Sequence, residues 1–348
     1  YVDAGGGDDL LQGRSSLSGT NRYYFDGGEG DDRISVIQRA SIDGGPGDDV
    51  IRATRNGDIV AYGGDGDDVV EVQLQTLFAS PDLRGGDASG DDPDATDTII
   101  IDTGSTSSSR PGVEIRPDPG NGASALTYRE IGSGFQEGRL QGFERIVGSS
   151  NPNASDNIQT RALDEELFGQ AGNDFLFAAG GNDVIYGGLG IDTMRGGQGD
   201  DLLHSDDVDD ILDGGEGIDT ASFASSFPDY PGQPFFSAVE DALQSQIVTA
   251  ASLTGKWIDL RDGLVEFVGG QNPAVLLGAP ARTAPRELIG IDNVYGTEAD
   301  DVIRGNNVDN VLSGAGGDDY IVGGFGDDTI IPGAGDDTVE GGAGVDTI

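Results

Sequence analysis

Residues 169–222 read, without a gap, GQAGNDFLF, AAGGNDVIY, GGLGIDTMR, GGQGDDLLH, SDDVDDILD and GGEGIDTAS. A second run starts at Gly296 and reads GTEADDVIR, GNNVDNVLS, GAGGDDYIV, GGFGDDTII, PGAGDDTVE and GGAGVDTI. Glycine recurs at the first, second and fourth places of these nine-residue repeats, aspartate at the sixth and an apolar residue at the eighth. Isolated surface turns have no reason to keep one phase through so many repeats, and the pattern therefore indicates a repeat architecture.

Each place in the repeat has a physical role. Glycine permits the positive φ angles of a tight turn and lets carbonyl groups approach an ion closely. Aspartate at the sixth place supplies a hard anionic oxygen, which suits Ca²⁺. The eighth residue belongs to a short strand and is expected to point inward. The pattern predicts an all-β fold, a parallel β-roll or β-helix solenoid that binds Ca²⁺ in its turns, with two repeats in each 18-residue coil. The predicted inward residues are Leu176, Ile185, Met194, Leu203, Ile303, Leu312, Ile321, Ile330, Val339 and Ile348.

The N-terminal region carries the same repeat at wider spacing. AGGGDDLLQ begins at Ala4, GGEGDDRIS at Gly27, GGPGDDVIR at Gly44 and GGDGDDVVE at Gly63. The last three starts are separated by about one full coil, which predicts that one side of each coil keeps its glycine turn. The other side has lost it, as in the eroded stretch at residues 56–60. A fifth repeat starts at residues 85–87 and is broken by an insertion.

These repeats resemble those of the RTX (repeats-in-toxin) proteins, a class of exported bacterial proteins. The resemblance implies a Ca²⁺-filled β-roll and type I secretion. Carried over by position, it implies metal ligation by the sixth-place aspartates and by glycines of the turns. In this sequence these are Asp9, Asp32, Asp49, Asp68, Asp174, Asp183, Asp192, Asp201, Asp219, Asp301, Asp319, Asp328, Asp337 and Asp346, with Gly28, Gly30, Gly45, Gly47, Gly64, Gly66, Gly188, Gly190, Gly197, Gly199, Gly324 and Gly326. Asp210 takes the same place in the repeat at Ser205, which lacks its glycines, and Asn310 replaces aspartate; metal binding by these two repeats stays open.

The repeats predict five segments. An irregular array covers residues 1–97, and regular arrays cover 151–222 and 296–348. The insertions between them, 98–150 and 223–295, each contain an alternating strand, at Val113–Pro117 and at residues 257–261. Each insertion ends on a similar line, LQGFERIVGS from Leu140 and LIGIDNVYGT from Leu288. Residues 237–251 predict one short helix, because a capping box is followed by apolar residues at helical spacing. The chain is expected to continue beyond both ends.

Composition excludes several classes of function. The chain of 348 residues has 63 acidic and 19 basic side chains, for a net charge of −44, which would repel nucleic acids and anionic membranes. It has no cysteine and a single histidine, His204, so zinc sites with several histidines are excluded. His204 follows an inward residue and is expected on the solvent-facing side of its strand. In pairs such as Asp48 and Asp49, the second acid has a metal role and the first faces solvent. We therefore expect no active site.

Counting neighbouring turns on the same side predicts about eight to eleven Ca²⁺ sites. Without metal the stacked aspartates repel one another, so the chain should be disordered at low calcium and fold outside the cell. The favoured function is a secreted structural protein of a surface layer, extracellular matrix or adhesin, with self-association or other surface components as partners. One alternative is the repeat region of a larger exported RTX enzyme or toxin. Another is an acidic protein of a salt-adapted organism.

Overall fold

The structure of the chain is a computed structural model. It describes residues 1–13, 22–37, 39–54, 59–73, 82–86, 95–102, 112–117, 125–130, 138–205, 210–223, 256–261, 264–267 and 288–348. These residues form two compact units, Tyr1–Ala178 and Ala179–Ile348, called here the N-terminal and the C-terminal unit. The five-segment division expected from the sequence stays a prediction beside this grouping.

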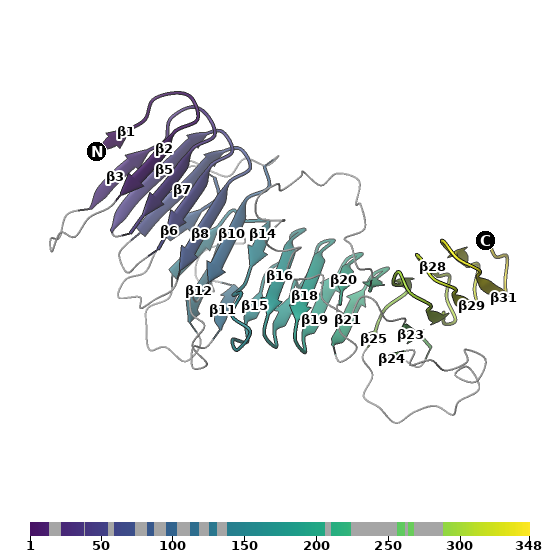
Figure 1. Cartoon of the computed structure of the whole chain (residues 1–348). Helices are drawn as coiled ribbons and strands as arrows, with labels where there is room; N and C mark the ends of the chain where they lie inside the picture. The colour runs from purple at the N-terminus through teal and green to yellow at the C-terminus, as the bar shows by residue number, and fades with distance from the viewer. Residues whose placement is uncertain are drawn as a thin grey trace. The chain divides into compact units, whose positions relative to one another are not determined.

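The N-terminal unit consists of two layers of strands (Figure 1). In sheet order, one layer contains β1 (Val2–Asp3), β3 (Tyr23–Asp26), β5 (Ala40–Pro46), β7 (Ile59–Asp65), β9 (Asp82–Arg84), β13 (Gly138–Gln141), β12 (Ala125–Glu130), β11 (Val113–Pro117), β15 (Asn157–Gln159) and β17 (Phe175–Phe177). The other contains β2 (Leu10–Gly13), β4 (Arg33–Val36), β6 (Val50–Ala53), β8 (Val69–Gln73), β10 (Thr98–Asp102), β14 (Arg145–Val147) and β16 (Glu166–Ala171). Successive strands of the chain alternate between the layers, as a solenoid requires.

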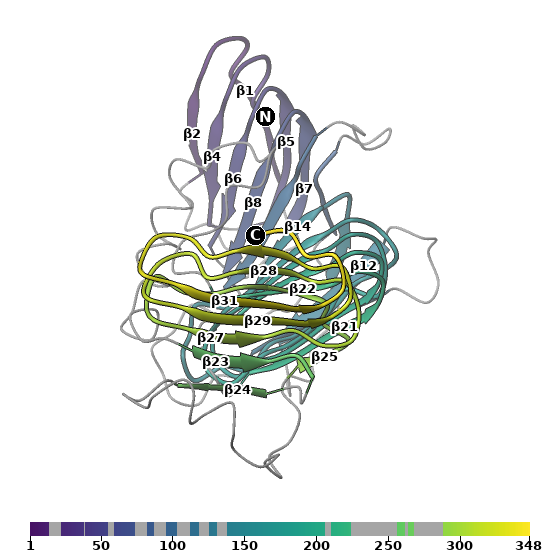
Figure 2. The same cartoon turned by 90° about the vertical axis from the view of Figure 1, so that its right-hand side faces the viewer.

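The C-terminal unit also consists of stacked coils, and its strands belong to three sheets (Figure 2). Its strands are β19 (Thr193–Gln198), β21 (Ile211–Glu216) and β25 (Leu288–Ile289) in one sheet, β18 (Val184–Leu189), β20 (Leu202–His204), β22 (Thr220–Ser222), β26 (Asn293–Tyr295), β28 (Val311–Ser313) and β30 (Thr329–Ile331) in a second, and β24 (Leu264–Phe267), β23 (Lys256–Asp259), β27 (Val302–Arg304), β29 (Tyr320–Phe325) and β31 (Thr338–Ala343) in a third. Among the described residues, no helix is long and apolar enough to span a bilayer.

The strand register confirms the predicted coil. Ile185 lies beside Leu203, and Leu203 beside Ala221, each pair in parallel strands one 18-residue coil apart. The eighth-place side chains fill the space between the layers, but the prediction is wrong at the end of the last array, where Val339 is only partly buried and Ile348 is 69% exposed. Fully buried examples are Leu176, Ile185, Met194, Leu203, Ile303, Leu312 and Ile321. The parallel β-solenoid predicted from the repeat is therefore confirmed.

Both insertions extend the sheets. Predicted strand Val113–Pro117 is β11, which pairs in parallel with β15 and antiparallel with β12. The second predicted strand is β23, which ends two residues earlier than expected and pairs in parallel with β27 and antiparallel with β24. The two insertions thus share one local topology. The helix expected at 237–251, residues 56–58 and residue 87 lie outside the described residues.

The expected exposure of His204 is wrong. Its side chain faces outward but is only 4% exposed, because the side chains of the neighbouring parallel strands cover it. The Tyr186 ring lies 5.4 Å from the imidazole, and the Ser222 hydroxyl lies 3.2 Å from Nδ1. Burial lowers the pKa of His204 to about 4. Alternation along a single strand could not reveal this cover, which comes from residues 18 positions away in the sequence.

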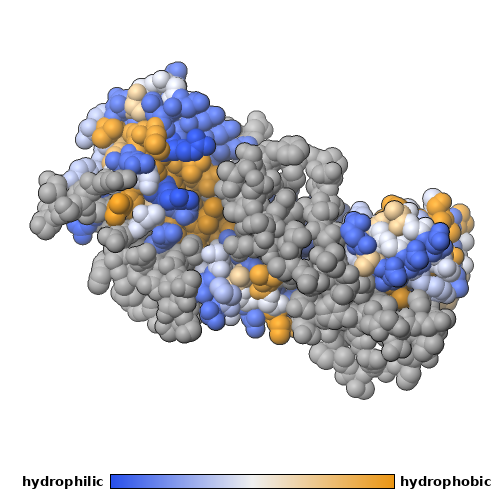
Figure 3. All heavy atoms as spheres, viewed as in Figure 1, coloured by the Kyte–Doolittle hydropathy of each residue, from blue (hydrophilic) through white to orange (hydrophobic). Residues whose placement is uncertain are grey.

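Hydrophilic residues occupy much of the visible described surface of both units, although apolar residues also reach it (Figure 3). Burial of the eighth place should therefore decide stability more than surface apolar residues do. We expect Ile185→Ala, at a fully buried position, to destabilise the Ca²⁺-loaded chain by about 2–5 kcal/mol. Ile218→Ala, at a position 60% exposed, should change little. Equal losses in thermal unfolding at saturating Ca²⁺ would contradict this packing.

Candidate metal sites

Glycine turns connect the layers. All twelve turn glycines predicted from the sequence have positive φ, between 91° and 136°. At Gly47 a Cβ would lie under 3.0 Å from both carbonyl atoms of Gly30 in the neighbouring coil, so a side chain has no room there. Three other second-place residues, Gln170, Ala179 and Ala315, adopt positive φ (74°, 76° and 72°) without being glycine. The stacked turns thus impose their conformation even on residues that disfavour it.

One carboxylate oxygen of most sixth-place aspartates connects neighbouring coils through a hydrogen bond. The main-chain N–H of Asp32 donates to Asp49 Oδ1 (2.7 Å), and that of Asp49 donates to Asp68 Oδ1 (2.8 Å). The same bond recurs between successive coils of the C-terminal unit, for example from Asp201 N–H to Asp219 Oδ1 (3.0 Å). These bonds fix the side chains of Asp49, Asp68 and Asp219 toward the interior of their turns.

At six of these residues the second oxygen is buried and has no hydrogen-bond partner within the described part of the chain. They are Asp32, Asp49, Asp68, Asp219, Asp319 and Asp328, at most 2% exposed. Beside Asp49, its Oδ2 and the carbonyl oxygen of Gly63 in the next coil occupy the space that a Cβ of Gly44 would need. A buried carboxylate oxygen without a donor is costly. Because carboxylate and carbonyl oxygens are the ligands that Ca²⁺ prefers, these turns fit a bound Ca²⁺.

Burial also shifts the titration of these groups. It raises the pKa of Asp49, Asp219 and Asp319 to about 7 and that of Asp68 to about 9. The carboxylates of neighbouring coils raise these values further, whereas the main-chain hydrogen bonds lower them. A bound cation would offset both the burial and the mutual repulsion.

The fifth-place acids differ from the sixth-place ones. Asp48 is exposed, and its Oδ1 accepts the N–H of Asp67 (3.1 Å). Among the described residues, no three acidic or histidine side chains form a cluster that could hold a metal. A cation in these turns would therefore take much of its coordination from backbone carbonyl groups, which explains why the repeat needs glycines as well as aspartate.

The structure aligns the predicted acids in rows. In the N-terminal unit Asp9, Asp32, Asp49 and Asp68 form one row, and Asp174 belongs to another. In the C-terminal unit the hydrogen-bonded rows are Asp183–Asp201–Asp219, Asp192–Asp210, Asp301–Asp319–Asp337 and Asn310–Asp328–Asp346. Asp301 differs from Asp319 and Asp328, because the Thr297 N–H donates to its Oδ2 (2.6 Å), whereas their Oδ2 is buried without a donor.

Sequence reasoning missed Asp97. It accepts the N–H of Asp68 (2.9 Å), and its Oδ2 lies against the Cα of Gly85 together with the carbonyl oxygen of Gly142. It is thus the sixth-place acid of the broken repeat at Gly85. The stretch Asp97-Thr98-Ile99 has the spacing of aspartate and inward residue, and this spacing could have identified it.

A substitution of the buried acid tests the cation assignment. Asp49→Asn keeps the Oδ1 acceptor for Asp32 but removes the charge, so we expect about one fewer bound Ca²⁺ per chain by equilibrium dialysis. The exposed neighbour offers a matched control, since Asp48→Asn should leave the count unchanged. Equal counts in the two variants would contradict a cation at Asp49.

The raised pKa values predict a pH dependence. Protonated carboxyls favour the metal-free fold below the unfolded pKa of about 4, and this stabilisation is lost as pH rises through the folded values of about 7 to 9. In chelator, the β-sheet circular dichroism should therefore be stronger near pH 4 than at pH 8. Protons and Ca²⁺ compete for these carboxylates, so the midpoint of the Ca²⁺ titration should move to higher concentration between pH 8 and pH 6. A midpoint independent of pH would refute this interpretation.

Comparison with known families agrees with this geometry. The model of the RTX calcium-binding nonapeptide repeat matches four copies, at residues 161–194, 187–221, 295–330 and 313–348. No curated protein sequence matches the chain significantly. The matched residues contain buried aspartates of the C-terminal unit, including Asp219, Asp319 and Asp328. Four matched RTX calcium-binding repeats, on coils that form a parallel β-solenoid, together support an RTX calcium-binding β-roll protein.

Proposed function

We propose that this chain is a secreted structural protein that folds on Ca²⁺ outside the cell and builds a surface layer, extracellular matrix or adhesin. The observation that carries the proposal is the row of buried carboxylates, in which Asp32, Asp49 and Asp68 each keep an oxygen without a donor. Such a row requires cations, and a protein built on it works where Ca²⁺ is abundant.

Electrostatics supports folding after export. The net charge of −44 opposes compaction, and the sixth-place acids lie one coil apart in hydrogen-bonded rows. Bound Ca²⁺ would neutralise part of this charge while coordinating the turns. We assign about eight to eleven ions to the stacked glycine turns and their sixth-place aspartates, as the stacking count gives, with the exception of Asp301, whose oxygens accept hydrogen bonds from Thr297.

The strands of both insertions join the sheets formed by the repeats, and this supports a structural role. In the N-terminal unit the strands of the first insertion join the same sheets as the repeats, with β10 and β14 between β8 and β16. In the C-terminal unit β23 and β24 extend the sheet of β27, β29 and β31. The insertions thus lengthen the solenoid. An acidic solenoid whose insertions also form coils suits a scaffold that self-associates or binds other surface components through Ca²⁺.

A Ca²⁺ titration of the chelator-stripped chain tests this proposal, with circular dichroism, size and negative-stain imaging followed together. We expect β structure to form, followed by ordered sheets or filaments at millimolar Ca²⁺; Mg²⁺ at equal concentration is the control. A compact monomer would contradict the assembly and favour the repeat region of a larger RTX enzyme or toxin. A chain that does not respond to Ca²⁺ would contradict Ca²⁺-driven folding itself.

A further inference from the structure

The two similar lines that close the insertions form shortened turns. Successive eighth-place residues are nine positions apart in the repeats, whereas Leu140 and Ile146 are six apart, as are Leu288 and Val294. All four side chains are buried between the layers. A single glycine in the left-handed region, Gly142 (φ 66°) or Gly290 (φ 62°), makes the tighter turn.

Each shortened turn binds the preceding coil through direct hydrogen bonds. Glu144 Oε2 accepts the N–H of Asp97 (3.0 Å), and Asp292 Oδ2 accepts that of Asp219 (3.3 Å). The carbonyl oxygen of Asp97 accepts two N–H groups of its shortened turn, at 3.2 and 3.0 Å, and that of Asp219 accepts two at 2.9 Å. An acid on a short turn thus takes the place of the sixth-place aspartate.

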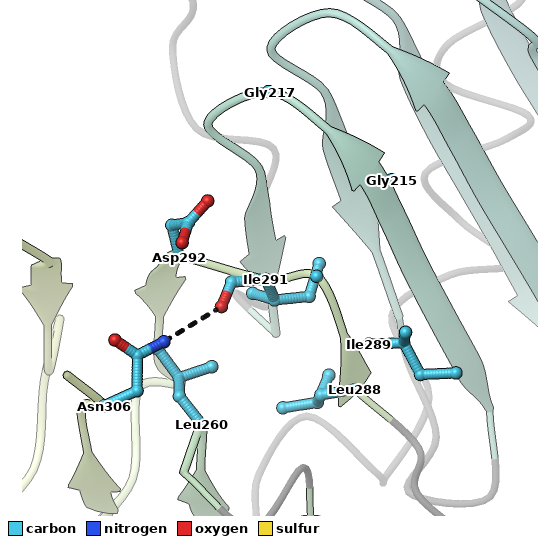
Figure 4. A pocket seen from close by; sticks show the side chains of 9 residues that line it. Gly215, Gly217, Leu260, Leu288, Ile289, Ile291, Asp292 and Asn306 are labelled. Carbon is cyan, nitrogen blue, oxygen red and sulfur yellow. Dashed lines mark hydrogen bonds between the residues drawn. The ribbon is translucent and has the colours of Figure 1, made fainter. Parts of the chain in front are cut away.

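The missing residues leave a pocket of about 320 Å³ in the C-terminal unit. Gly215 and Gly217 of the full turn line one side, and Asn306 of the next full turn lines another (Figure 4). Asn306 Nδ2 donates to the carbonyl oxygen of Ile291 across it (3.5 Å). Within the described residues, direct hydrogen bonds connect the coils at this point of the row in place of a glycine turn.

The turn after each shortened turn satisfies its acid with protein donors. Ser149 N–H donates to Asp156 Oδ2 (2.5 Å), and Val113 N–H donates to Asp156 Oδ1 (2.6 Å). Thr297 N–H donates to Asp301 Oδ2 (2.6 Å), and the Thr297 hydroxyl lies 3.1 Å from both oxygens. Ser149 and Thr297 are the last residues of the two similar lines, so the correspondence extends through both turns.

The site beside Asp301 otherwise has the geometry of the cation turns. Gly296 lies against Asp301 Oδ2 and the Gly314 carbonyl oxygen, just as Gly314 lies against Asp319 Oδ2 and the Pro332 carbonyl oxygen. The difference is the donor, since Asp319 Oδ2 is buried without one. Protein N–H and O–H groups therefore do at Asp301 what a cation would do at Asp319, one coil further along the chain.

The backbone conformation of the second-place residue decides whether protein donors or a cation compensate the carboxylate of a turn. Ala315, at the second place of the cation-type turn, has φ of 72°, whereas Thr297 at the same place is outside the positive-φ region. The Thr297 hydroxyl accepts the N–H of Ala299 (3.1 Å), a side-chain turn that directs the Thr297 N–H onto the acid. Asn306 repeats this bond with Val308 (3.0 Å), and its N–H donates to Asn310 Oδ1 (3.0 Å).

We infer that the two lines build calcium-independent joints, the N-terminal joint at residues 140–158 and the C-terminal joint at residues 288–313. This inference rests on the proposed Ca²⁺-driven folding of the other turns. At low Ca²⁺ the joints stay folded, supported by buried Ile146 and Ile158 in one unit and Val294 and Ile303 in the other. Ca²⁺ then orders the glycine turns outward from each joint, so the insertions mark the points from which folding spreads.

Hydrogen exchange of the full chain, in chelator and in Ca²⁺, tests the joints. In chelator we expect peptides from residues 145–158 and 293–304 to exchange about tenfold or more slowly than those from 33–53 and 320–331. Equal loss of protection in all four regions, with recovery in Ca²⁺, would overturn the joints while leaving Ca²⁺-driven folding intact. Equal protection with and without Ca²⁺ would contradict the proposed function instead.

A gain of metal binding gives a second test. The double variant Thr297→Gly, Ala299→Gly removes the donor hydroxyl and restores the glycine pattern of a cation turn. We expect it to bind about one Ca²⁺ more than the parent chain by equilibrium dialysis and to make peptides at 293–304 sensitive to chelator. Thr297→Ser, which keeps the hydroxyl and the N–H, is the matched control. An unchanged count in a folded double variant would show that protein donors do not replace a cation here.

Discussion

The structure depends on the different roles of the two oxygens of a buried carboxylate such as Asp49: one accepts a main-chain hydrogen bond, and the other has no protein donor. Oδ1 of Asp49 accepts a main-chain N–H from the coil before it, which connects coils and fixes the side chain inward. That orientation buries Oδ2 where no protein group donates to it. The hydrogen bond that connects two coils therefore brings with it a buried negative charge, and this charge must be compensated. Repetition of this arrangement makes the solenoid a calcium-dependent fold.

The conformation of one residue determines how the charge is compensated. Where the second place adopts positive φ, as at Ala315, the carboxylate of the turn stays without a donor. Where a threonine at that place makes its own side-chain turn, as at Thr297, the N–H satisfies the carboxylate directly. The same scaffold can therefore make calcium-dependent turns and self-satisfied turns, in which protein groups donate hydrogen bonds to the carboxylate. In each unit the self-satisfied turns occur where an insertion returns to the coils.

The sequence predicted the regular features because they are periodic. A strict nine-residue phase placed Leu203 inside and Asp201 in a turn, and both are buried there. What it could not predict depends on neighbours distant in sequence. His204 is covered by strands one coil away, and Asp97 is separated from its glycines by an insertion. Asp301 stands at the sixth place of its repeat, as the pattern requires. Its Oδ2, however, accepts a hydrogen bond from the Thr297 N–H, and the repeat pattern does not encode the backbone conformation that allows this bond.

The most direct test of the account is the position of each ion in crystals of the Ca²⁺-loaded chain, measured by anomalous scattering. The account predicts peaks within coordination distance of Oδ2 of Asp32, Asp49, Asp68, Asp219, Asp319 and Asp328. It predicts none beside Asp156 or Asp301, whose oxygens already accept protein hydrogen bonds. Peaks at every sixth-place acid alike, or none at the acids whose buried oxygen has no donor, would contradict it.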